Sequence, residues 1–201
     1  MIAEPLVPPL VVLLAGYLLG SIPFGVLITR AAGAGDLRSI GSGNIGATNV
    51  LRTGRKGLAA LTLLLDGAKG AAAVLLVRWL SPGHEELVAV GALIGHLYPL
   101  WLRFRGGKGV ATFFGIMAAL HWQSSIVYAV AWIGTLAISR YSSAAGMSAA
   151  LLAPVAAAAM GRFDLALLYL GFALLVVWKH RANIERLLAG AEPRVGSSGN
   201  G

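Results

Sequence analysis

Residues 109–139, GVATFFGIMAALHWQSSIVYAVAWIGTLAIS, contain no Asp, Glu, Lys or Arg. This stretch suits one long apolar helix, or two short helices if it is interrupted. The interruption would fall at residues 121–125, HWQSS, because such a polar and aromatic cluster suits the boundary between bilayer and water. The stretch therefore predicts one or two membrane spans, and the rest of the chain decides between them.

The composition favours a membrane protein. Of the 201 residues, 57% are hydrophobic and only 12% are charged, and the mean hydropathy is +0.77. Soluble domains carry about 25% charged residues, so the chain has too little polarity to cover a water-soluble surface. It contains no cysteine, which excludes a disulfide scaffold, a thiolate metal site and a cysteine nucleophile.

Cutting the chain where charges and turn residues cluster gives seven candidate spans. We expect an all-α, polytopic integral membrane protein in which residues 1–194 form a single transmembrane domain and residues 195–201 a flexible tail. Merging the fourth and fifth spans would leave six. The seven predicted spans are residues 5–29, 57–77, 87–102, 110–121, 123–139, 144–160 and 164–179.

The positive charges favour seven spans, because Lys and Arg near span ends remain on the cytoplasmic side. With the N-terminus outside, 13 of the 16 Lys and Arg residues lie inside, Arg78 and Arg162 lie outside, and Lys69 lies within a span. Six spans worsen the split to 9 against 6. We therefore expect the N-terminus outside and the C-terminus in the cytoplasm, with the glycine-rich polar segments on the cytoplasmic face.

The first of these segments is residues 41–52, GSGNIGATNVLR. It contains a G-x-G-x-x-G pattern, but a predicted membrane helix precedes it where a dinucleotide site needs a buried strand. Glycines that let backbone N–H groups approach a ligand are instead typical of an anion-binding nest. The alternative is a flexible turn. The candidate phosphate ligands here are Ser42, Gly43, Asn44, Thr48, Asn49 and Arg52.

The second segment is residues 95–112, GHLYPLWLRFRGGKGVAT, in which Lys108 stands among three glycines before a membrane helix. It is not a P-loop, because Leu102 and Gly109 stand where that motif needs Gly and Ser or Thr. A point charge, exposed N–H groups and a helix dipole together favour phosphate. The alternative is that the lysine only marks the cytoplasmic end of a membrane span and that the glycines only form tight turns. His96 is either a packed histidine or part of the site. The candidates here are His96, Gly106, Gly107, Lys108 and Gly109.

Three further features carry polar groups. Asp66 and Lys69 place opposite charges on one face of a span, so they must face protein, as a structural pair or as part of the site. Ser142 and Ser143 begin a helix, where serines are usually caps. His180 and Asn183 lie in residues 179–192, which read as a site or as a basic helix touching anionic lipid.

Basic residues and glycine nests beside apolar walls suit an amphiphile with a phosphate head and an acyl tail. The rival function is a transporter of organic phosphates, which needs polar groups near the bilayer midplane and often a repeat. Only Asp66 and Lys69 are candidates for the midplane, and no repeat is visible. A noncatalytic lipid-binding scaffold would not need so many glycines and hydroxyl groups.

Five ordered motifs span nearly the whole chain: GSIPFG at 20–25, residues 41–52, GHLYP at 95–99, FRGGKGVAT at 104–112 and HRANIERL at 180–187. Together they resemble the bacterial acyl-phosphate-dependent glycerol-3-phosphate acyltransferases, the PlsY family. The resemblance implies transfer of an acyl group from acyl phosphate to the 1-hydroxyl of sn-glycerol 3-phosphate, giving lysophosphatidic acid, at the cytoplasmic face of the bacterial inner membrane. Related enzymes that use acyl-CoA carry His-x4-Asp, whereas His180 and Glu185 are the nearest approach here.

With this reaction in view, we expect Lys108 and Arg52 to hold phosphate groups and His180 with Asn183 to orient the attacking hydroxyl or the acyl carbonyl. Ser142 and Ser143 are expected to help bind glycerol phosphate. Either His180 or a phosphate oxygen takes the proton. We expect no cofactor, no metal and no nucleic acid. The expected partners are membrane lipid and a cytoplasmic enzyme that forms the acyl phosphate.

Overall fold

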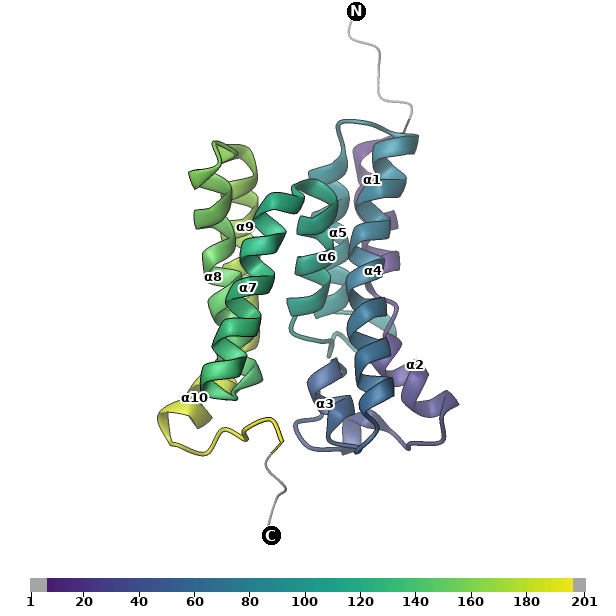
Figure 1. Cartoon of the computed structure of the whole chain (residues 1–201). Coiled ribbons are helices and arrows are strands. Elements are labelled where there is room, and N and C mark those ends of the chain that lie inside the picture. Colours follow the sequence, from purple (N-terminus) through teal and green to yellow (C-terminus); the bar gives the residue numbers. More distant parts are fainter. Residues whose placement is uncertain (1–6, 197–201) are drawn as a thin grey trace, which may run out of the picture. The chain divides into compact units, whose positions relative to one another are not determined.

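The computed structural model describes residues 7–196, and these residues form helices with no strand among them (Figure 1). The predicted all-α class is therefore confirmed. The helices are α1 (Pro9–Gly20), α2 (Phe24–Ala31), η1 (Leu37–Ser39), α3 (Ala47–Leu51), α4 (Lys56–Leu80), α5 (Glu85–Leu97), η2 (Leu100–Leu102), α6 (Val110–Leu120), α7 (Trp122–Ser139), α8 (Ser142–Ala159), α9 (Phe163–Lys179) and α10 (Arg181–Leu188).

The stretch 109–139 is interrupted as predicted. Helix α6 ends at Leu120 and α7 begins at Trp122, with His121 between them at φ −155° and ψ 89°. The His121 Nδ1 atom lies 2.8 Å from Ser124 Oγ, so the polar cluster stabilises the start of α7. The charge-free stretch therefore forms two helices.

Three helical segments among residues 7–196 are long and apolar enough to cross a membrane: Pro9–Ala31, Lys56–Leu80 and Ser142–Ala159. The pair α9 and α10, bent by 58°, makes a fourth if it is one broken span, and α6 is a shorter apolar helix. Among residues 7–196, each of the seven predicted spans overlaps helix, but their number and the sidedness of the chain stay predictions.

One predicted span contains an internal break and another is shortened, and proline explains both. The span predicted at 5–29 is split, because α1 ends at Gly20 and α2 begins only after Pro23, which has no N–H to continue a helix. The span predicted at 87–102 ends at Leu97, since Tyr98 precedes Pro99 and takes an extended φ of −140°.

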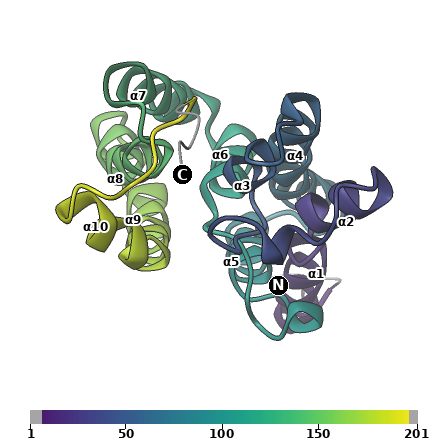
Figure 2. The same cartoon turned by 90° about the horizontal axis from the view of Figure 1, so that it is seen from below.

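The chain forms two compact units, one ending at Leu120 and the other beginning at His121. In the second unit, α8 packs against both α7 and α9 (Figure 2). The first residue of the predicted tail, Val195, is hydrogen-bonded to Arg140, with Val195 N donating to Arg140 O at 2.8 Å. Residues 197–201 of that tail lie outside the described range.

In the first unit, α1 packs along α5 and α4 along α6. Glycines let these backbones approach closely, as is common between membrane helices. A Cβ atom at Gly20 would clash with the carbonyl oxygen of Ala92, and one at Gly91 would clash with that of Leu13. Gly115 similarly lies against the backbone of Gly67. This close packing fixes the helices that carry the two glycine-rich segments.

Replacing Gly91 with alanine is expected to lower the free energy of unfolding by about 1–3 kcal/mol, because α1 and α5 must separate to admit the methyl group. The matched control is Gly171→Ala in α9, where a Cβ meets nothing within 4 Å. That change should leave stability unchanged or raise it by up to about 1 kcal/mol, since alanine is the better helix former. Unfolding of both variants in mixed detergent micelles measures the difference, and equal stability of the two would contradict the packing argument.

Candidate functional site

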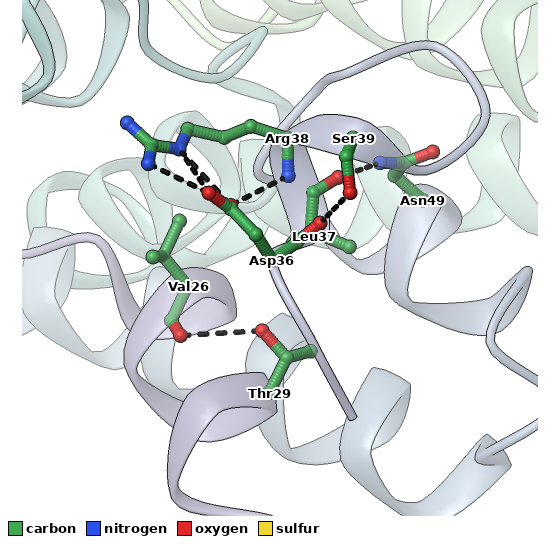
Figure 3. A network of polar contacts seen from close by, with 7 residues as sticks. All are labelled: Val26, Thr29, Asp36, Leu37, Arg38, Ser39 and Asn49. Atoms are coloured by element: carbon green, nitrogen blue, oxygen red, sulfur yellow. Dashed lines mark hydrogen bonds and ion pairs between the residues drawn. The ribbon is translucent and has the colours of Figure 1, made fainter. Parts of the chain in front are cut away.

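The first glycine-rich segment begins with a closed ion pair. Asp36 caps η1 by accepting a hydrogen bond from Arg38 N at 3.0 Å, and its Oδ2 lies 2.7 Å from Arg38 Nη2 (Figure 3). Hydrogen bonds from the Arg38 side chain and backbone lower the pKa of Asp36 to about 2. Arg38 is therefore neutralised by its neighbour.

Asn49 holds the loop together from inside. It is buried, and its Nδ2 donates to the carbonyl oxygen of Leu37 at 2.9 Å (Figure 3). The same nitrogen also donates to the carbonyl oxygen of Ile40 at 2.9 Å. Its Oδ1 accepts from Ser42 N at 3.2 Å and from Arg52 Nη1 at 3.4 Å. Both amide hydrogens of Asn49 are thus committed to the loop. Its contribution is to fix Ser42 and Arg52 in place.

The loop geometry requires glycine at two positions. Gly41 and Gly43 have φ values of 53° and 66°, in the left-handed region that favours glycine. A Cβ atom at Gly41 would lie 2.6 Å from Arg52 Nη1 and 2.7 Å from Asn49 Oδ1, so Arg52 packs directly over this glycine. The structure therefore brings Ser42, Asn49 and Arg52 together.

The remaining candidates of this loop lie at its rim. Asn44 Oδ1 accepts a hydrogen bond from Gly46 N at 3.0 Å, which forms a local turn before α3. Thr48 is exposed on α3, and Ser42 and Arg52 are exposed as well. The hydroxyl and guanidinium groups predicted to bind phosphate are therefore accessible.

The second segment folds back against the end of α5. Arg103 and Phe104 reverse the chain with φ values of 52° and 61°. After the reversal, Gly106 N donates to Leu97 O at 3.2 Å and Gly107 N donates to His96 O at 3.0 Å. A Cβ atom at Gly107 would clash with the ring of His96. The glycines are thus needed for close approach, and they deliver Lys108, which is half-buried, to the start of α6.

The predicted intramembrane pair is confirmed as facing protein. Lys69 Nζ lies 2.7 Å from Asp66 Oδ1, and the two side chains are 3% and 4% exposed. His96 is buried too, with its Nδ1 3.7 Å from Asp66 Oδ1. His96 therefore lies between this pair and the glycine backbone.

In the second unit, the candidates gather around a residue that sequence reasoning missed, Glu192. Its Oε1 accepts hydrogen bonds from Ser143 Oγ and Asn183 Nδ2, each at 2.6 Å, and its Oε2 accepts from Arg186 Nε at 2.8 Å. Burial raises the pKa of Glu192, but the three hydrogen bonds outweigh it and leave the pKa below its ordinary value. Glu192 thus stays ionised and fixes Ser143 and Asn183. In the sequence, Glu192 is marked only by being an acidic residue within a basic segment.

His180 occupies the bend between α9 and α10. It is buried, and its Nδ1 lies 2.8 Å from the carbonyl oxygen of Val176. Since a carbonyl only accepts, Nδ1 carries the proton, and Nε2 of the neutral ring can accept one. Ser142 is half-buried at the start of α8, beside Ser143.

These features define a class, a helical integral membrane protein with glycine-rich, basic segments suited to phosphate. Comparison with known protein families identifies one family within this class. Residues 10–190 match the model of a family described as glycerol-3-phosphate acyltransferase. The chain belongs to the glycerol-3-phosphate acyltransferase family. The resemblance that five sequence motifs indicate is therefore confirmed. The prediction of an acyltransferase of phospholipid biosynthesis is confirmed as well.

The relatives match almost end to end. The chain is 61% identical over 191 residues to a glycerol-3-phosphate acyltransferase of Novosphingobium aromaticivorans, covering 95% of this chain and 97% of the relative. It is 53% identical over 187 residues to one of Mesorhizobium japonicum, covering 93% and 96%.

Two solved structures are similar to this chain. One is PlsY (YgiH), an integral membrane glycerol 3-phosphate acyltransferase, in its glycerol 3-phosphate form, with a TM-score of 0.88, 34% identity and coverage of 94% of this chain and 96% of that one. The other is the lysophosphatidic acid form, with a TM-score of 0.86, 33% identity and coverage of 94% and 95%.

Proposed function

We propose that this protein transfers a fatty acyl group from acyl phosphate to the 1-hydroxyl of sn-glycerol 3-phosphate, giving lysophosphatidic acid and inorganic phosphate. The hydroxyl oxygen bonds to the acyl carbon, and the bond between that carbon and the phosphate oxygen breaks. The hydroxyl proton goes to His180 Nε2 or to a phosphate oxygen. The product is the first acylated intermediate of phospholipid synthesis.

The observation that carries the proposal is the backbone of residues 106–109. Gly106 and Gly107 pack against His96 and leave Lys108 at the start of α6, where its cation and the N-terminal end of the helix favour phosphate. Phosphate leaves a mixed anhydride readily, so the enzyme needs positioning and charge neutralisation more than a strong acid. Lys108 and Arg52 fit that requirement.

The residues around Glu192 supply the second part of the proposal. Glu192 holds the side chains of Ser143 and Asn183, which we assign to glycerol phosphate and to the reacting hydroxyl or carbonyl. His180 is fixed by the Val176 carbonyl with its Nε2 as the basic nitrogen. Ser142 is assigned to the same substrate. No cofactor enters this reaction.

The donor is the part of the proposal that an assay tests first. Purified protein in liposomes is given glycerol 3-phosphate with palmitoyl phosphate, palmitoyl-CoA or palmitoyl acyl carrier protein, each alone. We expect lysophosphatidic acid from palmitoyl phosphate only. Product from either thioester, and none from the acyl phosphate, would contradict the proposed donor.

We further propose that the site faces the cytoplasm of the bacterial inner membrane, where an enzyme that forms acyl phosphate is the expected partner. The support is the asymmetry of the basic residues. Because the chain has no cysteine, a single thiol reports sidedness without background. Cysteine at the exposed Ala189 should be protected from an impermeant maleimide in intact cells, whereas cysteine at the exposed Pro82 should react. The reverse pattern would contradict the orientation.

A further inference from the structure

The buried pair in α4 contacts three other segments of the first unit. Lys69 Nζ donates to the carbonyl oxygen of Ile22, in the break between α1 and α2, at 2.8 Å. Asp66 Oδ1 accepts from Lys69 and lies 3.7 Å from Nδ1 of His96 in α5. The backbone oxygen of Asp66 accepts from Thr112 Oγ1 in α6 at 3.0 Å. One residue, Asp66, therefore touches both the segment before Lys108 and the segment after it.

The chain on either side of Lys108 is fixed by these contacts. On the N-terminal side, Gly107 N donates to His96 O, and the Gly107 backbone lies against the His96 ring. On the C-terminal side, Thr112 is buried in the first turn of α6. Any shift of Asp66 would move one or both anchors. The position of Lys108 thus depends on the placement of Asp66, through its carboxylate toward His96 and its backbone oxygen toward Thr112.

The chemistry of the pair points to positioning. Two charges are expensive to bury, and apolar side chains of similar size commonly hold helices together as well or better. The pair does something that apolar groups cannot, because Lys69 satisfies the Ile22 carbonyl and Asp66 faces a histidine ring nitrogen.

We propose that Asp66, neutralised by Lys69, is a positioning residue that acts through His96 and Thr112 to hold Lys108 where the phosphate of the substrate binds. This inference rests on the proposed function, because it assigns Lys108 to phosphate. It adds that the ion pair sets the geometry of the glycine-rich segment.

The first test removes both charges together with Asp66→Asn/Lys69→Met, so that no unpaired charge is left in the bundle. The control is Arg162→Gln/Asp164→Asn, which removes an ion pair of similar length, 2.6 Å, between exposed side chains. We expect kcat/KM of the buried double variant to fall roughly tenfold to 100-fold, with the folded fraction unchanged. Wild-type kcat/KM, or a loss fully explained by unfolded protein, would overturn the proposal.

The second test reads the backbone directly by hydrogen exchange of the protein in detergent. In the wild type, the Gly106 and Gly107 amides should be protected, and in the double variant they should exchange at least about tenfold faster while α8 and α9 keep wild-type rates. Unprotected glycines in the wild type, or equal exchange in the two proteins, would overturn the positioning role. If the wild type uses an acyl thioester instead of acyl phosphate, the proposed function fails. The hydrogen-exchange rates, and the ratio of kcat/KM between the double variant and the wild type with that thioester, still test whether Asp66 positions the glycine-rich segment.

Discussion

Replacing Lys108 with alanine is expected to lower kcat/KM for acyl transfer about 100- to 1,000-fold, the cost typical of removing one preorganised group that stabilises transition-state charge. Lys108 is half-buried between two buried glycines, so its side chain is partly shielded from water, which strengthens its attraction for phosphate. Backbone N–H groups remain after the substitution, but the charge that neutralises the leaving phosphate is lost. Initial rates of lysophosphatidic acid formation measure the effect.

Two further variants separate charge from folding. Lys108→Arg keeps the charge but replaces a compact ammonium group by a larger, planar guanidinium group. We therefore expect its activity to lie between those of the wild type and the alanine variant. Lys56→Ala removes an exposed lysine at the start of α4 and should leave the rate unchanged. Equal activity of Lys108→Ala and Lys56→Ala would contradict the role assigned to Lys108.

Replacing Glu192 with glutamine is expected to destabilise the second unit by about 1–3 kcal/mol, because Ser143, Asn183 and Arg186 lose a charged hydrogen-bond acceptor. Glutamine keeps the size of the side chain, but it cannot accept from Ser143, Asn183 and Arg186 through two oxygens. Glu185→Gln changes an exposed carboxylate on α10 and is the matched control. Thermal unfolding in detergent compares the two variants, and equal melting temperatures would show that the Glu192 cluster contributes no stability.

The pH dependence of stability gives a second measure of the same change. Because the pKa of folded Glu192 lies below its ordinary value of 4.5, its stabilisation is complete above about pH 4.5 and is lost as the pH falls through the folded pKa. The stability difference between the wild type and Glu192→Gln should therefore be constant at neutral pH and shrink in acid. A difference that grows on acidification would contradict the lowered pKa.

Local patterns predicted most of the helices and both glycine-rich segments. The interruption at His121 was legible because polar and aromatic residues divide an otherwise apolar run. Pro23 and Pro99 also carry a local signal, but apolar residues on both sides of each proline favoured uninterrupted spans. The prediction therefore followed the length of the apolar runs, whereas the structure shows a helix break at each of the two prolines.

Contacts between distant residues could not be predicted in the same way. Glu192 reaches Ser143 across 49 positions of sequence because the chain reverses after α10 at Gly190, whose φ is 68°. An amide in a glycine-rich loop, such as that of Asn49, can bind phosphate, yet the same amide can equally satisfy carbonyls such as that of Leu37. Residue type shows which groups can form hydrogen bonds, whereas the fold determines their partners.

The most direct test of the central claim is to count both products in one reaction. Purified wild-type protein in liposomes receives glycerol 3-phosphate and palmitoyl phosphate, with no thioester and no added metal. The proposed reaction predicts lysophosphatidic acid and inorganic phosphate in equal amounts, with the acyl group on the 1-hydroxyl. Phosphate released without lysophosphatidic acid, or no reaction at all, would contradict it.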